Sequence, residues 1–196
     1  MNNEKQKLLD FIQSIFPMPL SNADEIVSQF TRREFQKNDI ILKEGKVCNE
    51  YYYLESGFVR VFTFDLEGND VTTAFGSANQ IVCEIFSFFK RVPSAESIQA
   101  LSDCKMWMIT FDQLQYIFHA MPQFREFGRT ILVNAYASLK QRTLYMIRKT
   151  AEERYLHLLD TNPDIFQHAQ LKNIASYLGV TDTSLSRIRR EFSKSK

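Results

Sequence analysis

The chain has 196 residues, enough for one large domain or two modest ones, and 44% of them are hydrophobic, so it can bury a core. Its formal net charge of +1 hides an asymmetry: residues 140–196 hold 11 Lys and Arg against 6 Asp and Glu, whereas residues 1–139 hold 13 against 17. The basic C-terminal part favours an anionic partner. The sequence has no apolar run of about 18 residues and no signal region, which excludes a membrane helix and favours a cytoplasmic protein.

The first 120 residues are expected to form two short helices and then an antiparallel β domain. Residues 8–16 and 23–30 have helical apolar patterns, and Pro17 ends the first. Between residues 40 and 109, aromatic and β-branched runs alternate with turn signals, and Gly68 tolerates the positive φ of a tight hairpin. Strands at roughly ten-residue spacing predict an antiparallel sandwich or barrel.

The three cysteines, Cys48, Cys83 and Cys104, match no zinc or redox motif in their spacing. Each lies in a largely apolar stretch, so we expect reduced core thiols, no metal and no cofactor. A redox role for Cys83 is a further option, but no neighbouring residue in the sequence accounts for a lowered thiol pKa.

Residues 121–150 are predicted to form one long helix, with Pro122 in its first turn. Its apolar positions follow the 4-3-4-3 spacing of a coiled-coil seam. The seam consists of Leu132, Tyr136, Leu139, Thr143 and Met146. This stripe could pack on the chain's own sheet. However, Phe127, Ile131, Ala135 and Tyr145 form a second apolar surface, so we expect that surface to face the β domain and the seam to face a partner subunit.

Residues 151–196 have the spacing of a helix-turn-helix. A helix through residue 159 is stopped by Pro163, and helices are predicted over 170–178 and 182–193. Ala175, Gly179, Leu185 and Ile188 lie at offsets 0, 4, 10 and 13. The small Ala175 lets the two helices cross closely, and Gly179 accepts the positive φ of the turn. Leu185 and Ile188 face the core and so fix the orientation of the second helix. This pattern strongly indicates DNA binding.

The outward side of that second helix supplies the candidate DNA contacts. Asp182, Thr183 and Arg187 can reach base edges, and an arginine can bind guanine through two hydrogen bonds. The predicted phosphate contacts are Thr181, which is also the expected N-cap, with Ser186, Arg189, Arg190 and Lys194. The alternative is an ordinary solvated amphipathic helix.

A β domain, a long helix and a C-terminal helix-turn-helix follow one another along the chain. In this order the chain resembles the Crp/Fnr transcription regulators, and residues 151–192 look most like the orphan members abundant in the Bacteroidetes. The resemblance implies an α+β fold with three parts. They are a jelly roll of the cyclic-nucleotide-binding type (1–120), a dimerisation helix (121–150) and a winged-helix-type helix-turn-helix (151–196). It also implies a homodimer on a palindromic operator in double-stranded DNA, with RNA polymerase as a further partner. Asp182 and Thr183 replace the commoner Arg-Glu pair, so the usual operator is not assumed.

The same resemblance locates a nucleotide cassette, which in the family has a Gly-Glu pair, a short helix and an Arg-Ser pair. Glu84 matches, Cys83 replaces the glycine, and Ser94 and Ala95 stand where the Arg-Ser pair belongs. Arg91 lies three residues early. A buried phosphate without its arginine is an uncompensated charge, so we do not expect cyclic AMP. The pocket near Glu84, Ser94 and Ala95 is expected to bind an unknown small-molecule effector or none.

Two other classes were considered. The strand region would suit a cupin-type enzyme, but residues 1–118 contain no histidine to bind its metal, and no other catalytic motif is present. The second alternative is a small-molecule-binding regulatory module that acts without sequence-specific DNA binding. The missing arginine and the complete helix-turn-helix argue against it, and we therefore predict a regulator that is not an enzyme.

Overall fold

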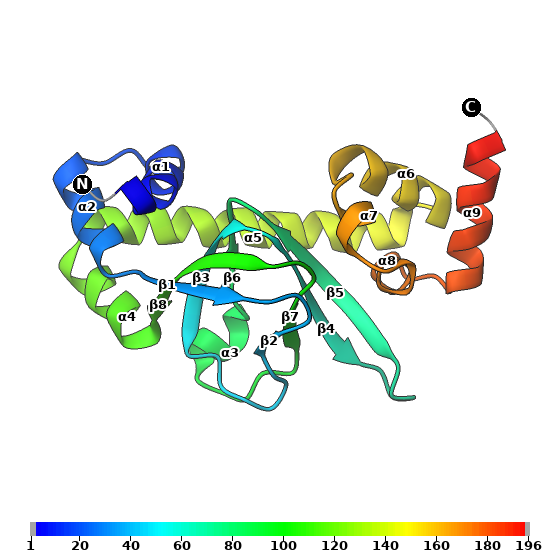
Figure 1. The fold of residues 1–196 in the computed structure, drawn as a ribbon, viewed down its shortest axis with the longest axis horizontal. Coiled ribbons are helices and arrows are strands. Elements are labelled where there is room, and N and C mark those ends of the chain that lie inside the picture. The colour runs from blue at the N-terminus through cyan, green and yellow to red at the C-terminus, as the bar shows by residue number, and fades with distance from the viewer. Residues whose placement is uncertain (1–2, 195–196) are drawn as a thin grey trace.

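The computed structural model describes residues 3–194, which form a β sandwich with helices at both ends (Figure 1). One sheet has the strand order β1-β8-β3-β6 and the other β2-β7-β4-β5, with every pairing antiparallel. The strands are β1 (Thr31–Phe35), β2 (Ile40–Leu42), β3 (Glu50–Ser56), β4 (Phe58–Phe64), β5 (Asp70–Ser77), β6 (Gln80–Val82), β7 (Ser97–Ala100) and β8 (Cys104–Thr110). A short helix, α3 (Ile85–Lys90), separates β6 from β7.

The sandwich has an apolar interior because the central strands are rich in β-branched, aromatic and sulfur-containing residues. Leu54 of β3, Val59 of β4, Ile98 of β7 and Met106 of β8 are all at most 1% exposed and form one cluster. Burying side chains of this size contributes roughly 1.5–3 kcal/mol each, which stabilises the two sheets against one another.

A second core lies where helices cover the other side of the β1-β8-β3-β6 sheet. The 3-10 turn η1 (Asn3–Lys5) leads into α1 (Gln6–Ile15). In this core, α1, α2 (Leu20–Ser28) and α4 (Phe111–Ala120) pack with Tyr53 and Trp107 of the sheet. The helix α4 begins with a capping box in which Thr110 and Gln113 exchange side-chain and backbone hydrogen bonds. Phe124 and Phe127 of the next helix complete this core.

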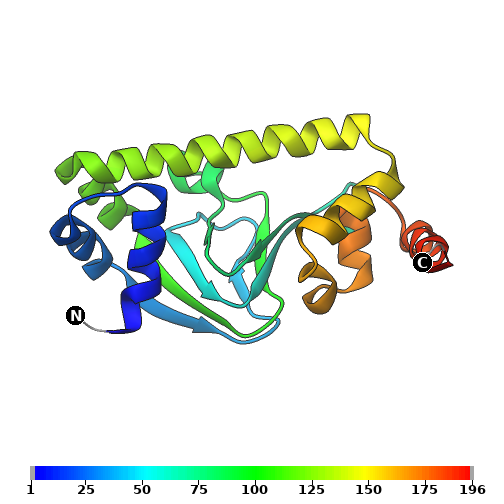
Figure 2. The same cartoon turned by 90° about the horizontal axis from the view of Figure 1, so that it is seen from above.

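That next helix, α5 (Pro122–Arg148), runs along the length of the molecule from the N-terminal helices to the C-terminal ones (Figure 2). The C-terminal helices are α6 (Ala151–Thr161), α7 (Ile165–His168), α8 (Leu171–Tyr177) and α9 (Asp182–Lys194). From residue 151 to residue 194 the structure describes helices alone. The helix-turn-helix is therefore present, but these residues form no β wing.

The predicted α+β fold is confirmed, and the structure adds elements that were not expected, namely η1, β1, α4 and α7. The strand β1 was missed because it reads Thr-Arg-Arg-Glu-Phe and is an edge strand that pairs with β8 alone, so it lacks an apolar face. The helix α4 was missed although the Thr110–Gln113 capping-box spacing was visible in the sequence.

Candidate nucleic-acid interface

The C-terminal helices are organised by the residues that the helix-turn-helix spacing singles out. Ala175 is 1% exposed where α8 meets α9, and Leu185 and Ile188 of α9 are buried in the same cluster. Ile174 and Leu178 of α8 complete the contact. The inward side of α9 is therefore fully used in packing, which holds its opposite side outward.

The turn between α8 and α9 needs the glycine that the sequence places there. Gly179 has φ +66°, in the left-handed region, and a Cβ at this position would lie 2.7 Å from Cε of Met146. The helix α9 is then capped by Thr181, whose hydroxyl accepts a hydrogen bond from the backbone N–H of Ser184 over 3.2 Å. The same hydroxyl donates to Oγ of Ser184, so both its donor and one acceptor direction are used within the turn.

The outward side of α9 carries the predicted DNA-contacting residues. All of those whose side chains are described are exposed: Thr181, Asp182, Thr183, Ser186, Arg187, Arg189 and Arg190. Thr183, Ser186, Arg187 and Arg190 line one shallow hollow of about 290 Å³, together with Ser184. Lys194 ends α9, and its side chain lies outside the described residues. The geometry thus presents two guanidinium groups and three hydroxyl groups together.

The inner apolar pattern of the long helix α5 faces the N-terminal core only in its first half, because Tyr145 stacks on His157 of α6 instead, with ring centroids 4.6 Å apart. Phe127 is buried and Ile131 packs against the N-terminal core. The five predicted seam residues are all exposed in the single chain: Leu132, Tyr136, Leu139, Thr143 and Met146. Leu132 and Tyr136 also line an apolar groove of about 490 Å³. Tyr136 is 70% and Leu139 62% exposed, a face typical of one that packs against another molecule.

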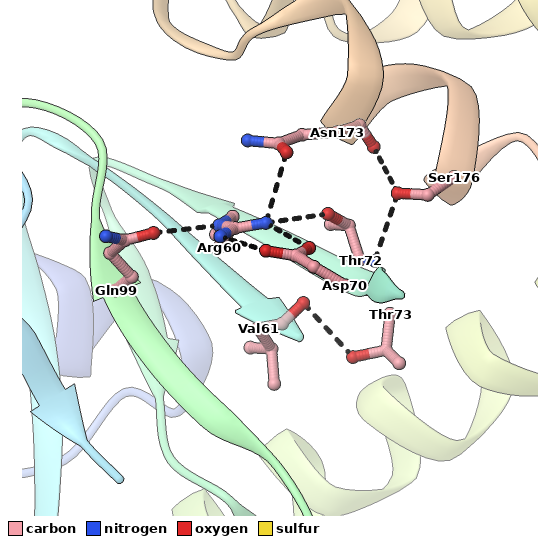
Figure 3. A network of polar contacts seen from close by, with 8 residues as sticks. All are labelled: Arg60, Val61, Asp70, Thr72, Thr73, Gln99, Asn173 and Ser176. Carbon is pink, nitrogen blue, oxygen red and sulfur yellow. Dashed lines mark hydrogen bonds and ion pairs between the residues drawn. The ribbon is translucent and has the colours of Figure 1, made fainter. Parts of the chain in front are cut away.

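The helix-turn-helix is docked on the β sandwich through a polar network that the sequence did not reveal (Figure 3). Arg60 of β4 is only 6% exposed and forms a bidentate ion pair with Asp70 of β5. Its Nη1 and Nη2 donate to the Oδ1 and Oδ2 of Asp70 over 2.6 and 2.7 Å. Its Nη1 also donates to Oδ1 of Asn173 in α8 over 3.1 Å. The backbone N–H of Thr72 donates to Oγ of Ser176 over 3.1 Å. A lone arginine in the apolar run Phe-Val-Arg-Val-Phe was the available signal.

Further contacts join the end of α5 to the same region. Arg142 of α5 donates to the backbone oxygens of Thr73 and Tyr177, so one side chain spans β5 and α8. Its guanidinium lies 4.1 Å from the ring centroid of Tyr177, within the range of a cation–π contact. Arg154 of α6 donates to the oxygen of Leu178. These bonds connect the sandwich, the long helix and the helix-turn-helix, so a change in one can move the others.

Apolar contacts cross the same junction. The ring of Phe58 in β4 stacks on His168 at 5.3 Å, and Phe75 of β5 lies 5.1 Å from Tyr177. Phe58 and Leu101 belong to the same buried cluster as the helix-turn-helix core. The C-terminal helices and the sandwich thus share one hydrophobic cluster.

The predicted effector residues each have another contact in the fold. Glu84 is the N-cap of α3 and accepts hydrogen bonds from the backbone N–H groups of Phe86 and Ser87, at 3.0 and 2.8 Å. Ser94 is buried and donates to the oxygen of Glu96, and Ala95 is exposed. Arg91, the possible substitute arginine, donates to the oxygen of Cys48 and to Asn49. An effector at Glu84, Ser94 and Ala95 stays a prediction.

Between residues 3 and 194, no group of three or more His, Cys, Asp and Glu side chains is arranged to hold a metal ion. In the same range, no helix combines the length and apolar character needed to cross a bilayer.

Comparisons with known proteins agree with this architecture. Residues 32–120 match the family model of the cyclic nucleotide-binding domain. The chain is 26% identical to the fumarate and nitrate reduction regulatory protein of Vibrio cholerae, over 90% of this chain and 74% of that protein. It is 26% identical to regulatory protein HlyX of Actinobacillus pleuropneumoniae, over 90% and 76%. The solved structure of CLP, the c-di-GMP-responsive global regulator of Xanthomonas campestris, superposes with a TM-score of 0.71 at 16% identity, over 90% and 93%.

Residues 32–120 therefore form a domain of the cyclic nucleotide-binding type, which is followed by a long helix and a helix-turn-helix. Over 90% of its length, the chain is similar to regulatory proteins of the Crp/Fnr type.

Proposed function

We propose that this protein is a homodimer that recognises a palindromic operator in double-stranded DNA through α9. The observation that carries the proposal is the outward side of α9, where Thr183, Ser186, Arg187 and Arg190 surround one hollow while Leu185 and Ile188 are buried behind them. Short side chains near the N-terminus of a recognition helix can approach base edges, and Arg187 can bind a guanine through two bonds.

In this proposal Asp182, Thr183 and Arg187 contact bases, and Thr181, Ser186, Arg189, Arg190 and Lys194 contact phosphates. The charge of the C-terminal part supports it, because residues 140–196 carry 11 basic and 6 acidic side chains. Each phosphate neutralised by Lys or Arg releases counterions, so the affinity should fall steeply with salt concentration.

Dimerisation is proposed to occur through the exposed seam of α5, from Leu132 to Met146. Two paired α5 helices would place the two α9 helices about 34 Å apart, one turn of DNA, which suits an imperfect palindrome. The protein is proposed to act in the cytoplasm, with RNA polymerase as a further partner. Any small-molecule effector, which we do not expect to be cyclic AMP, would shift the helix-turn-helix between two populated positions relative to α5.

The proposal is tested by selecting random duplex DNA with the purified, ligand-free protein and measuring binding of the recovered sequence over a salt series. A palindrome with a steep salt slope is expected. The alternative is a regulatory module without sequence-specific DNA binding. It would be favoured if a folded dimer recovered no specific sequence, either alone or with added small molecules.

Arg187→Ala tests the predicted base contact. Its loss should cost roughly 1–3 kcal/mol, about 5- to 150-fold in affinity, and relax the preference at one operator position. Lys43→Ala is the matched control, because it removes one positive charge from an exposed position on the sandwich. An equal loss on all sequences for Arg187→Ala would instead identify Arg187 as a phosphate contact.

A further inference from the structure

Two cysteines that are 35 positions apart in the sequence lie side by side in the structure. The Sγ atoms of Cys48 and Cys83 are 4.0 Å apart. Cys48 lies between β2 and β3, whereas Cys83 follows β6 and directly precedes Glu84, the N-cap of α3. Both are free thiols. A disulfide has an S–S distance of about 2.05 Å, so a closure of about 2 Å would join them.

Both cysteines are attached to the same short helix, which holds them in place. The backbone N–H of Cys48 donates to Oγ of Ser87 in α3 over 2.9 Å. The backbone oxygen of Cys48 accepts from Arg91, the C-cap of α3, also over 2.9 Å. Because Cys83 leads directly into α3, a bond between the two sulfurs would pull the Cys48 segment and the start of α3 together.

The two thiols differ in the way that a reactive pair requires. The sulfurs of Cys48 and Cys83 share a hydrogen bond, and this interaction is the main cause that lowers the pKa of Cys48 below its ordinary value. Burial raises the pKa of Cys83 well above its ordinary value. Cys48 is therefore the more readily ionised of the two thiols, and the thiolate is the nucleophilic form.

The third cysteine provides an internal comparison. Cys104 lies in the other core, between the sheets, where its thiol donates to the backbone oxygens of Ser102 and Phe58. Burial is the main cause that raises its pKa. Its environment disfavours the thiolate, so Cys104 should react slowly.

We propose that Cys48 and Cys83 are a redox modification site. A small peroxide oxidises the two thiols to a reversible disulfide between them. The thiolate of Cys48 attacks the O–O bond, giving a Cys48 sulfenic acid and releasing hydroxide from hydrogen peroxide. The sulfur of Cys83 then attacks the Cys48 sulfur, and the sulfenic oxygen leaves as water with the proton of Cys83. The oxidant must be small because Cys48 is only 4% exposed.

The site is independent of DNA recognition by α9, and its test does not use DNA. The reduced full chain is treated with a small excess of hydrogen peroxide, quenched in acid, alkylated and mapped by mass spectrometry. We expect a loss of 2 Da per chain, a Cys48–Cys83 linked peptide, and reversal by dithiothreitol. Closing this loop should also raise the Tm by roughly 5–10 °C.

Three single variants separate a reactive pair from incidental proximity. Cys83→Ser should trap the Cys48 sulfenic acid, which dimedone labels, whereas Cys104→Ser should leave the disulfide unchanged. Cys83→Ala should move the pH midpoint of Cys48 alkylation upward, because it removes the shared hydrogen bond. Three results would each overturn the proposal. Cys104 could be oxidised as fast as Cys48 in the folded protein, or disulfides could form only between chains. The third is a pH midpoint of Cys48 alkylation that Cys83→Ala does not change.

Discussion

Replacing Asn173 with alanine should loosen the helix-turn-helix from the β sandwich. The guanidinium of Arg60 donates to Oδ1 of Asn173 over 3.1 Å, and both residues are at most 6% exposed. A buried hydrogen bond to a charged group contributes about 1.5–3 kcal/mol. Because Arg60 keeps both bonds to Asp70, and alanine is the better helix former by about 0.5 kcal/mol, we expect the lower end of that range. The free energy of unfolding should fall by about 1–2 kcal/mol.

Urea unfolding followed by circular dichroism measures this change, and Asn134→Ala is the matched control. Asn134 is exposed on α5, so its replacement brings the same gain in helix propensity without the loss of a buried bond. Hydrogen exchange at the amide of Thr72, which donates to Ser176 of α8, reports the docking directly and should accelerate. If the two variants unfold at the same urea concentration with unchanged exchange at Thr72, the bond to Asn173 does not hold the helices to the sandwich.

Three other substitutions test separate parts of the structure. Gly179→Ala should destabilise the turn by about 1–2 kcal/mol in urea unfolding, mainly through the φ of +66°, since the flexible end of Met146 can move away; an unchanged midpoint would contradict this. Leu139→Asp should lower the dimer content in sedimentation and the DNA affinity together, and a variant that stays dimeric would remove Leu139 from the interface. Glu84→Ala should cost about 1 kcal/mol of stability because α3 loses its N-cap, and equal stability to the parent would show that the two backbone bonds contribute little.

The sequence by itself determined the elements whose signals are local. The helix-turn-helix could be predicted because its spacing demands particular residues at particular places. Ala175 is buried at the helix crossing, Gly179 has the positive φ, and Leu185 and Ile188 face inward, as that spacing requires. Pro122 likewise begins α5, Phe127 is buried, and the residues of the predicted seam are exposed. Such features depend on backbone geometry over a few helical turns. That geometry requires particular residue types at short separations in the sequence, so it can be predicted from the spacing.

Only the tertiary structure decided the contacts between distant segments. Arg60 and Asn173 are 113 positions apart, and although a lone arginine in an apolar run is visible in the sequence, its partner in α8 is not. The spacing of Cys48 and Cys83 matches no motif, yet the strands and α3 bring the two sulfurs to 4.0 Å. Glu84 aligned with a ligand-binding residue, but its carboxylate caps α3. Hydrogen bonds and thiol pairs depend on separations of a few ångströms, and for residues this far apart those separations arise only when sheets and helices pack.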